Sequence, residues 1–428
     1  MLRKIVFWSH LGAGFIAGVV VFVMSVTGVL LTYQRQMTAW ADMRGLNGAP
    51  PAANAARMAP EALLGRVLQT EKGAPTSVVW RGAADAPVAV SFGRERTVFV
   101  NAYTGETLGT GATGMRTFFR KITEWHRWMG ATGENRERGG ALTGACNLLF
   151  FFLLLSGAIL WIPKQWRRAN LRNIMWFRRG LRPKARDFNW HHVFGFWMFI
   201  PLAIIIASGV VISYSWASEL VFRVVGESPP PRQGEGGGGA GGAPKGRAEG
   251  GRGAAEGGRA EGGRGGAGEG RGAAEGGRGE GGRGGNGEGR GAPKLAGLDP
   301  LWAQAVARAP GWKILTMQVP PKPDAPVSFT LDRGTGGQPQ TRATLAFDRE
   351  TGRVTKWEPF AATSTGRQLR GILRFAHTGE VLGIVGQTVA GIASLAAALL
   401  VWTGISLSLR RFAAWRSRRK SPRAATPA

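Results

Sequence analysis

The sequence contains few of the residues that build disulfide frameworks and hydrolytic sites. Cys146 is the only cysteine among 428 residues, so no intrachain disulfide can form. No C-x-x-C-H motif occurs, so any haem would be held without a covalent bond. A Walker loop, an H-E-x-x-H motif and a nucleophile elbow are not evident. These absences leave nucleotide hydrolysis, zinc proteolysis and serine hydrolysis without support.

Histidine is also scarce, and its few positions are informative. The chain has five histidines: His10, His126, His191, His192 and His377. With the adjacent His191 and His192 counted as one position, each lies at or near one end of a long apolar segment. Neutral imidazole is the usual protein ligand of haem iron. The placement of histidine therefore largely decides which chemistry this chain can support.

Four apolar runs exclude an ordinary soluble protein. They cover roughly residues 5–33, 142–162, 193–216 and 381–409. Each reaches the ~20 residues that a helix needs to cross a hydrocarbon core of ~30 Å, and charges are absent from their centres. The first run is too long for the core of a signal peptide, so it is expected to remain as a helix. The sequence thus predicts a membrane all-α bundle of four transmembrane helices.

The positive charge is concentrated in short segments. The net charge is +28, and basic residues crowd the start of the chain, the 163–189 link and the residues after 409. Short loops rich in Lys and Arg remain in the cytoplasm. Both termini and the link are therefore predicted to be cytoplasmic, whereas 34–141 and 217–378 are predicted to lie outside. This distribution favours membrane topology over nucleic-acid binding as the reason for the charge.

The chain reads as an internal duplication, since each half has a histidine-bearing helix, an outside unit, a second histidine and a returning helix. In the first unit, residues 60–70 favour a helix, and 78–81, 87–92 and 97–101 favour strands before a turn at 103–106. In the second, 300–308 favour a helix, and 314–319, 327–331 and 344–348 favour strands before a turn at 350–353. Each α+β unit is small for a self-sufficient core, so the two are expected to pack on the membrane helices or on each other.

Residues 232–294 differ from the rest of the chain. They repeat Gly, Arg, Glu and Ala with almost no apolar side chains. Such a segment cannot bury enough surface to offset the entropy of ordering, so a disordered insertion outside the membrane is expected. An RNA-binding Arg-Gly tract is the alternative, but the predicted topology places the segment away from RNA.

The histidines fall into two pairs, one on each side of the membrane. His10 and His191 begin the first and third helices, and His126 and His377 precede the second and fourth. Because a haem takes one imidazole on each face, the pairs predict an inner haem on His10 and His191 and an outer haem on His126 and His377. Interface histidines can also be simple polar anchors, and this alternative stays open.

A glycine follows three of these histidines at the fourth position, namely Gly14, Gly130 and Gly195. On a helix such residues share a face, and glycine there leaves room for a flat macrocycle beside the ligand. Glycine is also common in membrane helices for close packing. The same spacing favours His191 as the inner ligand and leaves His192 as its alternative.

His126 is expected on a short surface helix at 115–129, with Trp125 and Trp128 at the level of the lipid headgroups. An outer haem there could reach a bulky acceptor that never enters the membrane. The cytoplasmic segments are too short for a flavin or nicotinamide domain, so electrons would come from a separate donor, either a quinol or a cytoplasmic flavoprotein.

Several motifs together resemble the PepSY-associated transmembrane-helix family. They are VFVNAYTGETLG, EWHRWMG, RDFNWHHVFGFW and RFAHTGEVLGIVGQ, the last followed by an apolar helix that ends in WTGISLSLRR. The resemblance covers nearly the whole chain except the insertion. Some members are bacterial inner-membrane ferric-siderophore reductases with two b-type haems, so it implies iron release from a ferric siderophore in the periplasm. His192 and the insertion depart from the family pattern.

The resemblance completes a predicted domain organisation. Transmembrane helices are placed at 1–33, 141–162, 190–216 and 366–409, the last with a periplasmic approach. Two small periplasmic PepSY-like domains are placed at 34–114 and 295–365. The remaining segments are a surface helix and loop at 115–140, a connector at 217–231, the insertion at 232–294, and cytoplasmic segments at 163–189 and 410–428.

Three functions follow from these patterns. The first is a dihaem electron-transfer protein that acts as a haem-dependent oxidoreductase on a ferric siderophore. The second is a membrane anchor whose PepSY-like domains bind or restrain a periplasmic partner without redox chemistry. The third is a transporter for iron or its chelate, which is weakened because no broken, polar-lined helix is expected.

Overall fold

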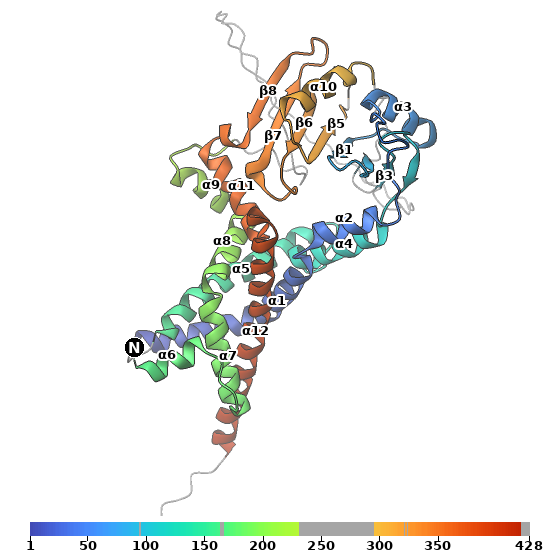
Figure 1. Cartoon of the computed structure of the whole chain (residues 1–428). Helices are drawn as coiled ribbons and strands as arrows, with labels where there is room; N and C mark the ends of the chain where they lie inside the picture. The colour runs from blue at the N-terminus through green and yellow to red at the C-terminus, as the bar shows by residue number, and fades with distance from the viewer. Residues whose placement is uncertain (94–95, 163–166, 231–294, 321, 323, 421–428) are drawn as a thin grey trace, which may run out of the picture. The chain divides into compact units, whose positions relative to one another are not determined.

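The computed structural model describes residues 1–93, 96–162, 167–230, 295–320, 322 and 324–420 (Figure 1). The insertion predicted at 232–294 lies outside the described residues, so its disorder stays a prediction. The described residues contain the four apolar segments and the strands of both outside units.

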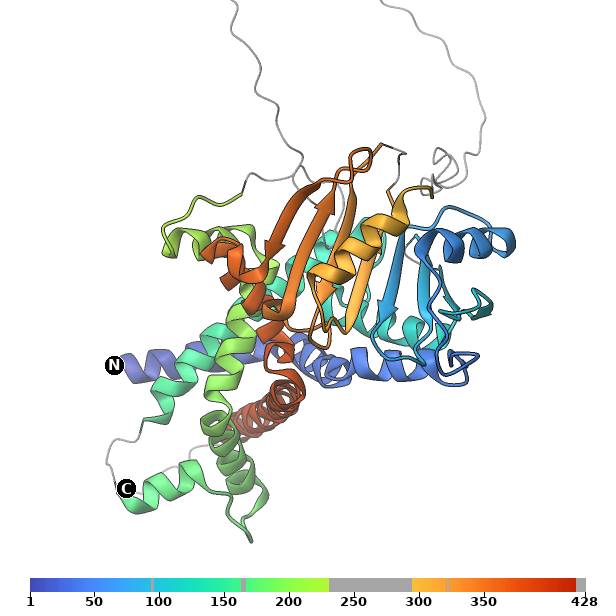
Figure 2. The ribbon, with the colours of Figure 1, turned by 45° about the horizontal axis from the view of Figure 1, so that its top comes forward.

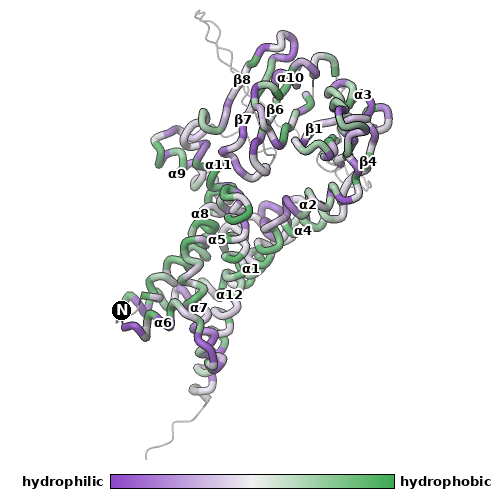
Figure 3. The backbone as a smooth tube through the Cα atoms, in the orientation of Figure 1, coloured by the Kyte–Doolittle hydropathy of each residue, from purple (hydrophilic) through white to green (hydrophobic). Residues whose placement is uncertain are grey.

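Among the described residues, three helices are long and apolar enough to cross a membrane: α1 (Leu2–Leu31), α5 (Asn135–Trp161) and α12 (Gly383–Lys420). The pair α7 (Pro183–Trp197) and α8 (Phe199–Ser213) makes a fourth span if the two helices cross together. Large apolar side chains on these helices are exposed, including Phe15, Ile200 and Trp402, as expected of a surface that faces lipid. Figure 3 shows the hydrophobic residues that run along α1, α5 and α8. The chain is therefore a membrane protein.

The third span is not the single helix that the sequence predicted at 190–216. It is bent by 69° between α7 and α8, at Met198. Pro201 explains the break, because proline lacks the N–H that would bond the carbonyl of Trp197 and its ring collides with that carbonyl. A broken helix is thus present, contrary to expectation, although the residues at the break, Trp197, Met198 and Phe199, are apolar.

The two sides of the bilayer can be named from the order of the spans. The ends of α1 and α8 and the beginnings of α5 and α12 share the side that carries the strands, termed the sheet side. The opposite side carries the basic 167–186 segment and is termed the basic side. Small buried residues such as Ala17, Ala393 and Ala397 line the contacts between the spans and let the helices approach closely.

Short helices accompany the spans. The helix predicted at 115–129 is confirmed as α4 (Thr113–Trp128), which packs on α1 and α5, while its place at the membrane surface stays a prediction. The sequence did not predict the other four, which are α2 (Gln34–Met43), α6 (Arg168–Met175), α9 (Ser215–Val224) and α11 (Thr365–His377). The predicted connector at 217–231 is therefore largely helical. The 3-10 turn η3 (Glu380–Leu382) joins α11 to α12.

The strands of both halves form one antiparallel sheet of eight strands. The strands are β1 (Ser77–Arg81), β2 (Val88–Phe92), β3 (Arg96–Val100), β4 (Thr107–Gly109), β5 (Ile314–Gln318), β6 (Val327–Asp332), β7 (Arg342–Phe347) and β8 (Val354–Pro359). Their order in the sheet is β4-β3-β2-β1-β5-β6-β7-β8. The first strands of the two halves pair, with Val79 opposite Thr316. All six predicted strands are confirmed, and β4 and β8 were missed.

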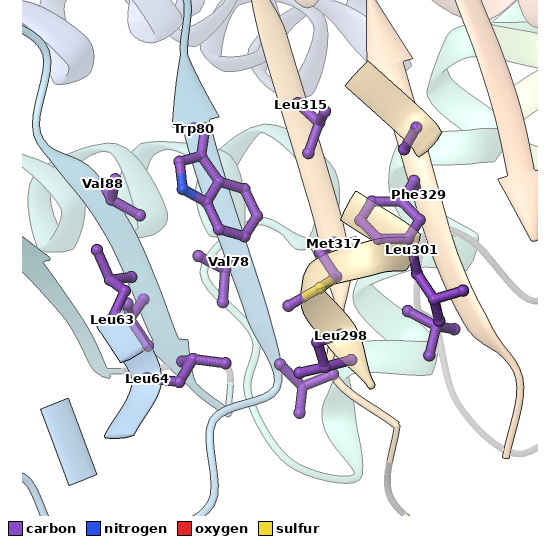
Figure 4. Packing of buried hydrophobic residues seen from close by; sticks show 14 of the residues in the cluster. Leu63, Leu64, Val78, Trp80, Val88, Leu298, Leu301, Leu315, Met317 and Phe329 are labelled. Atoms are coloured by element: carbon purple, nitrogen blue, oxygen red, sulfur yellow. The ribbon is translucent and has the colours of Figure 1, made fainter. Parts of the chain in front are cut away.

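One hydrophobic core serves both halves. Each half begins with a helix, α3 (Pro60–Thr70) or α10 (Leu298–Arg308), and these helices were predicted at nearly the same residues. Leu63, Trp80, Leu301 and Met317 belong to a single buried cluster on one face of the sheet (Figures 2 and 4). The units predicted at 34–114 and 295–365 are thus joined, because neither alone buries enough apolar surface.

The two halves also cap each other's helices. The Glu61 carboxylate accepts hydrogen bonds from the backbone N–H groups of Gly297 and Asp299, at 2.8 and 3.1 Å. The Asp299 carboxylate in turn accepts from the backbone N–H of Glu61, at 2.8 Å. Free N–H groups at a helix N-terminus favour such an acceptor, so α3 and α10 each depend on a residue from the other half.

This reciprocal capping predicts that substitutions of Glu61 and Asp299 have coupled effects on the free energy of unfolding. Asp299→Ala is expected to lower the free energy of unfolding by about 1 kcal/mol, and Glu61→Ala by a similar amount, because each leaves helix N–H groups without an acceptor. The double variant is expected to lose less than the sum of the two, since both changes act on one contact. Denaturant unfolding followed by tryptophan fluorescence measures this, with the exposed turn residue Glu350→Ala as the neutral control. Strict additivity would contradict the shared contact.

Candidate functional site

Four of the five histidines make the same kind of hydrogen bond to a neighbouring helix. Each imidazole Nδ1 lies within hydrogen-bonding distance of a serine or threonine hydroxyl on a membrane helix. The pairs are His10 with Ser156 at 2.8 Å, His126 with Thr27 at 2.9 Å, His191 with Thr403 at 3.0 Å and His377 with Ser208 at 3.3 Å. In every pair both residues belong to the same half of the chain, so the arrangement occurs twice in each half.

A glycine follows each of these hydroxyl residues and lies against the ring. A Cβ atom built on the glycine would lie near the imidazole Cε1. The distances are 3.4 Å for Gly157 and His10, 3.6 Å for Gly28 and His126, 3.5 Å for Gly404 and His191, and 3.3 Å for Gly209 and His377. Side chains larger than alanine at these positions would displace the rings. The Ser/Thr-Gly pair therefore forms a seat for the imidazole, here termed a histidine seat.

The hydroxyl groups determine which ring nitrogen carries the proton. Each hydroxyl also donates to the backbone carbonyl four residues earlier. These bonds are Thr27 to Val23 at 2.6 Å, Ser156 to Phe152 at 2.7 Å, Ser208 to Ile204 at 2.6 Å and Thr403 to Leu399 at 2.8 Å. A hydroxyl has one proton, so it can only accept from the imidazole. Nδ1 therefore carries the hydrogen in a neutral ring, and Nε2 keeps a free lone pair.

The rings of His126 and His377, the predicted outer pair, lie close together. His126 lies in the last turn of α4 and His377 ends α11, and their ring centroids are 6.3 Å apart with an angle of 62° between the planes. Two imidazoles that bind one metal from opposite sides, through bonds of about 2 Å, have ring centres about 6 Å apart. The carbonyl of Ile205 also accepts from His377 Nδ1, at 2.9 Å, which supports the same protonation. This pair could hold a metal centre between the two Nε2 atoms.

Burial favours the neutral form of the rings of His126 and His377. Burial, and secondarily the nearby His377, lowers the pKa of His126 to about 4. Burial also lowers the pKa of His377. Neutral imidazole is the form that binds metals. In addition, the Thr143 hydroxyl donates to the carbonyl of Arg127 at 2.7 Å, which attaches the end of α4, and so His126, to α5.

On the basic side, His10 bonds Ser156 of α5 and His191 bonds Thr403 of α12. His192 lies close to its neighbour, with its ring centroid 6.4 Å from that of His191. Its Nδ1, however, bonds the Phe188 carbonyl of its own helix at 2.9 Å, and its ring packs on Phe188. Among the described residues, His192 thus has no hydrogen bond to a second helix of the kind that His191 makes with Thr403. This difference favours His191 as the member of the inner pair.

A buried carboxylate holds the helix of His191 in place. Asp187 is one turn before His191 on α7. Its carboxylate accepts a hydrogen bond from Ser406 at 2.9 Å and forms an ion pair with Arg410 at 3.1 Å, both on α12. Thr403 belongs to the same face of α12. Contacts at two successive turns thus fix α7 against α12. The sequence pattern gave no sign of this role for Asp187.

The glycines that the sequence singled out have other surroundings. Gly14 and Gly195 are in helices, where a Cβ atom built on each would meet only a leucine, Leu153 at 3.8 Å and Leu400 at 3.9 Å. Gly130 lies beyond the end of α4 with a φ of 77°, so it does not share a helix face with His126. The glycines that touch the rings were missed. The Ser/Thr-Gly pairs could have revealed them, since Thr27 and Ser208 each follow a histidine by 17 residues.

The two sets of histidines are well separated. Seventeen residues of continuous helix correspond to about 25 Å, so His10 and the seat at Thr27 lie near opposite faces of the bilayer. No group of three or more His, Cys, Asp or Glu side chains is placed to hold a metal ion within the described part of the chain. A pair is nevertheless enough for haem, because the porphyrin supplies four more nitrogen ligands.

Comparison with models of protein families shows which family this chain belongs to. The model of the PepSY-associated TM region matches residues 7–423. The chain belongs to this family. A comparison with curated proteins gave no significant match. All four histidine seats lie inside the matched region, so they are part of the PepSY-associated region of this chain.

The histidine seats predict that, in this PepSY-associated protein, alanine destabilises the fold at a seat glycine but not at a helix glycine outside the seats. Gly209→Ala is expected to destabilise the fold by about 1–3 kcal/mol, because its Cβ would lie 3.3 Å from His377 Cε1 and 2.9 Å from Asn147 Nδ2. Gly12→Ala, also in a membrane helix, has no atom within 4 Å of its Cβ and is expected to be neutral or slightly stabilising. Thermal unfolding in detergent compares the two, and equal midpoints would argue against a tight seat.

Proposed function

We propose that this PepSY-associated membrane protein binds two b-type haems and carries electrons from the basic side to the sheet side. The observation that carries the proposal is the repeated histidine seat. In each, Nδ1 is bonded to a hydroxyl of a membrane helix and Nε2 is free. His10 and His191 would hold the inner haem, and His126 and His377 the outer haem.

A haem held between two imidazoles supplies reversible one-electron transfer at its iron. The chain's contribution is to orient the ligands and to exclude water. The hydroxyl partners fix the rotation of the rings and raise their basicity, as hydrogen bonds to the other nitrogen of a metal-binding histidine generally do. Between the two pairs lies an apolar layer that includes Val21, Phe150, Leu154 and Ile206. This layer would keep protons and water from the path of the electron.

The charge distribution supports this direction of transfer. Arg178, Arg179 and Arg182 lie on the basic side, and such short basic segments remain in the cytoplasm. The protein would then lie in the inner membrane with both termini in the cytoplasm and the sheet in the periplasm. A quinol or a cytoplasmic flavoprotein would donate to the inner haem, since the described cytoplasmic segments hold no domain for a redox cofactor of their own.

The acceptor that fits the outer side is a ferric siderophore. Arg120 and Arg127 on α4 and Arg370 and Arg374 on α11 are exposed on the two helices that carry the outer histidines. This basic surface favours a chelate with anionic oxygens. One electron converts its ferric ion to the ferrous state, and no bond to the protein is needed. Hard oxygen ligands hold ferrous iron less tightly, so reduction would release the metal.

The absorption spectrum of protein purified from haem-replete cells tests the ligand assignment. The unaltered protein is expected to give a reduced b-type spectrum with two haems per chain. His126→Ala or His377→Ala should remove the outer haem, and His10→Ala or His191→Ala the inner haem, which halves the signal in each case. His192→Ala is expected to keep both haems. A protein without haem would leave the binding of a periplasmic partner, or transport, as the function.

A second prediction concerns the histidine seats. Thr27→Val is expected to lower retention of the outer haem by about 10- to 100-fold, because His126 Nδ1–H loses its acceptor and the ligand is no longer oriented. Thr27→Ser should restore it. Ser25→Ala on the same helix is the matched control, since that hydroxyl bonds only the carbonyl of Val21. Rates of haem transfer to apomyoglobin give the measurement, and equal rates in all three variants would refute the role of Thr27.

A further inference from the structure

A concave site separate from the histidine seats lies on the basic side, next to the helix of His191. It is a pocket of about 530 Å³ between α7 and the loop that follows α6. Its wall contains three arginines, Arg178, Arg179 and Arg186, and three aromatic residues, Phe177, Trp190 and Phe194. Arg186, Trp190 and Phe194 follow one another at intervals of four residues and so share a face of α7. The adjacent face carries Asp187 and His191.

The aromatic side of the pocket is well ordered by mutual packing. Phe177 packs edge-on against Phe194, with ring centroids 5.1 Å apart, and against Trp190 at 6.5 Å. Nearby, the Trp197 indole N–H donates to the carbonyl of Met175 at 2.9 Å. Tryptophan and phenylalanine at the end of a membrane span are typical of the boundary between headgroups and acyl chains. This wall therefore suits hydrocarbon that enters from the bilayer.

The basic side of the pocket lacks a matching acid. Among the described residues that line it, none is acidic. Arg186 is engaged, since its guanidinium bonds the neighbouring Asp187 at 2.9 Å and lies over the Trp190 ring at 5.3 Å. Arg178 donates one N–H to the Asn173 side chain at 2.9 Å and has further N–H groups to offer. Arg178 and Arg179 are both exposed, so two positive charges remain available to an anion.

We propose that this pocket binds the headgroup of an anionic phospholipid from the bilayer leaflet on the basic side. The phosphate accepts hydrogen bonds from the guanidinium groups of Arg178 and Arg179, and the acyl chains lie along Phe177, Trp190 and Phe194. Guanidinium groups pair well with phosphate oxygens, and basic pockets between membrane helices on the cytoplasmic side take such headgroups. A quinol fits less well. Its oxidation releases protons, and the ionisable residues that line the pocket are arginines, which stay protonated.

The bound lipid has a structural consequence. It joins the loop after α6 to α7, the helix that presents His191 to Thr403. This role requires neither haem nor a siderophore, so it stands apart from the electron-transfer function.

Native mass spectrometry of the full-length protein tests the proposal. The protein is released from nanodiscs that contain equal amounts of phosphatidylglycerol and phosphatidylcholine. The unaltered protein is expected to retain phosphatidylglycerol in preference, and Arg178→Gln/Arg179→Gln to retain it at least about tenfold less. The pair Arg168→Gln/Arg416→Gln removes the same charge elsewhere on the basic side and is expected to retain the lipid. Arg178→Lys/Arg179→Lys is expected to keep much of the binding, which separates lost charge from lost folding.

Four outcomes would overturn the proposal. Equal loss in the two glutamine pairs would mean that the lipid is attracted by net charge alone. Displacement of the lipid by millimolar inorganic phosphate would mean that the pocket takes a free anion. Retention of an added quinone in place of phosphatidylglycerol would mean a donor site. Retention of both lipids in equal amounts would mean that no headgroup is selected.

Discussion

An imidazole inside a membrane domain needs a partner for its N–H group, and in this protein that need organises the membrane domain. Each of the four histidines finds its acceptor on a different helix from its own. The hydroxyls that serve as acceptors are themselves bonded to their own backbone, so they can neither turn away nor offer a proton. The result is a set of contacts that are both structural and chemical. They fix how the helices pack, and they leave the same nitrogen free on every ring.

Both halves of the chain use this device in the same way. In the first half, α1 provides a histidine at one end and a seat at the other, and α5 provides the second seat. In the second half, α7 and α8 together take the place of α1, and α12 that of α5. The sheet repeats the pattern outside the membrane, where β1 and β5 meet at its centre and the helices α3 and α10 cap each other. A duplicated chain thus forms one sheet and one core.

The sequence predicted the elements better than their assembly. Apolar runs, alternating strands and the surface helix were recovered within a few residues, because each depends on local periodicity. The bend at Met198 was missed although Pro201 is visible in the sequence, because the length of the apolar run suggested one helix. The pairing of β1 with β5 could not be predicted, since it joins strands more than 200 residues apart. Whether Gly14 and Gly195 leave room for a haem stays a prediction, and the sequence reasoning did not find the glycines that touch the rings. It searched along the histidine's own helix, whereas Gly28, Gly157, Gly209 and Gly404 lie on the neighbour.

The pairing of β1 with β5 at the centre of the sheet also means that the sheet cannot be completed until the second half of the chain has been synthesised. β1 is made early, but its partner β5 begins at Ile314, about 230 residues later. At a synthesis rate of about 5–20 residues per second, the hydrogen-bonding edge of β1 would stay unpaired for roughly 10–50 seconds. An open edge of this kind, in a strand as apolar as Ser77–Arg81, readily pairs with other chains. The first half must therefore be protected from aggregation until the second half emerges.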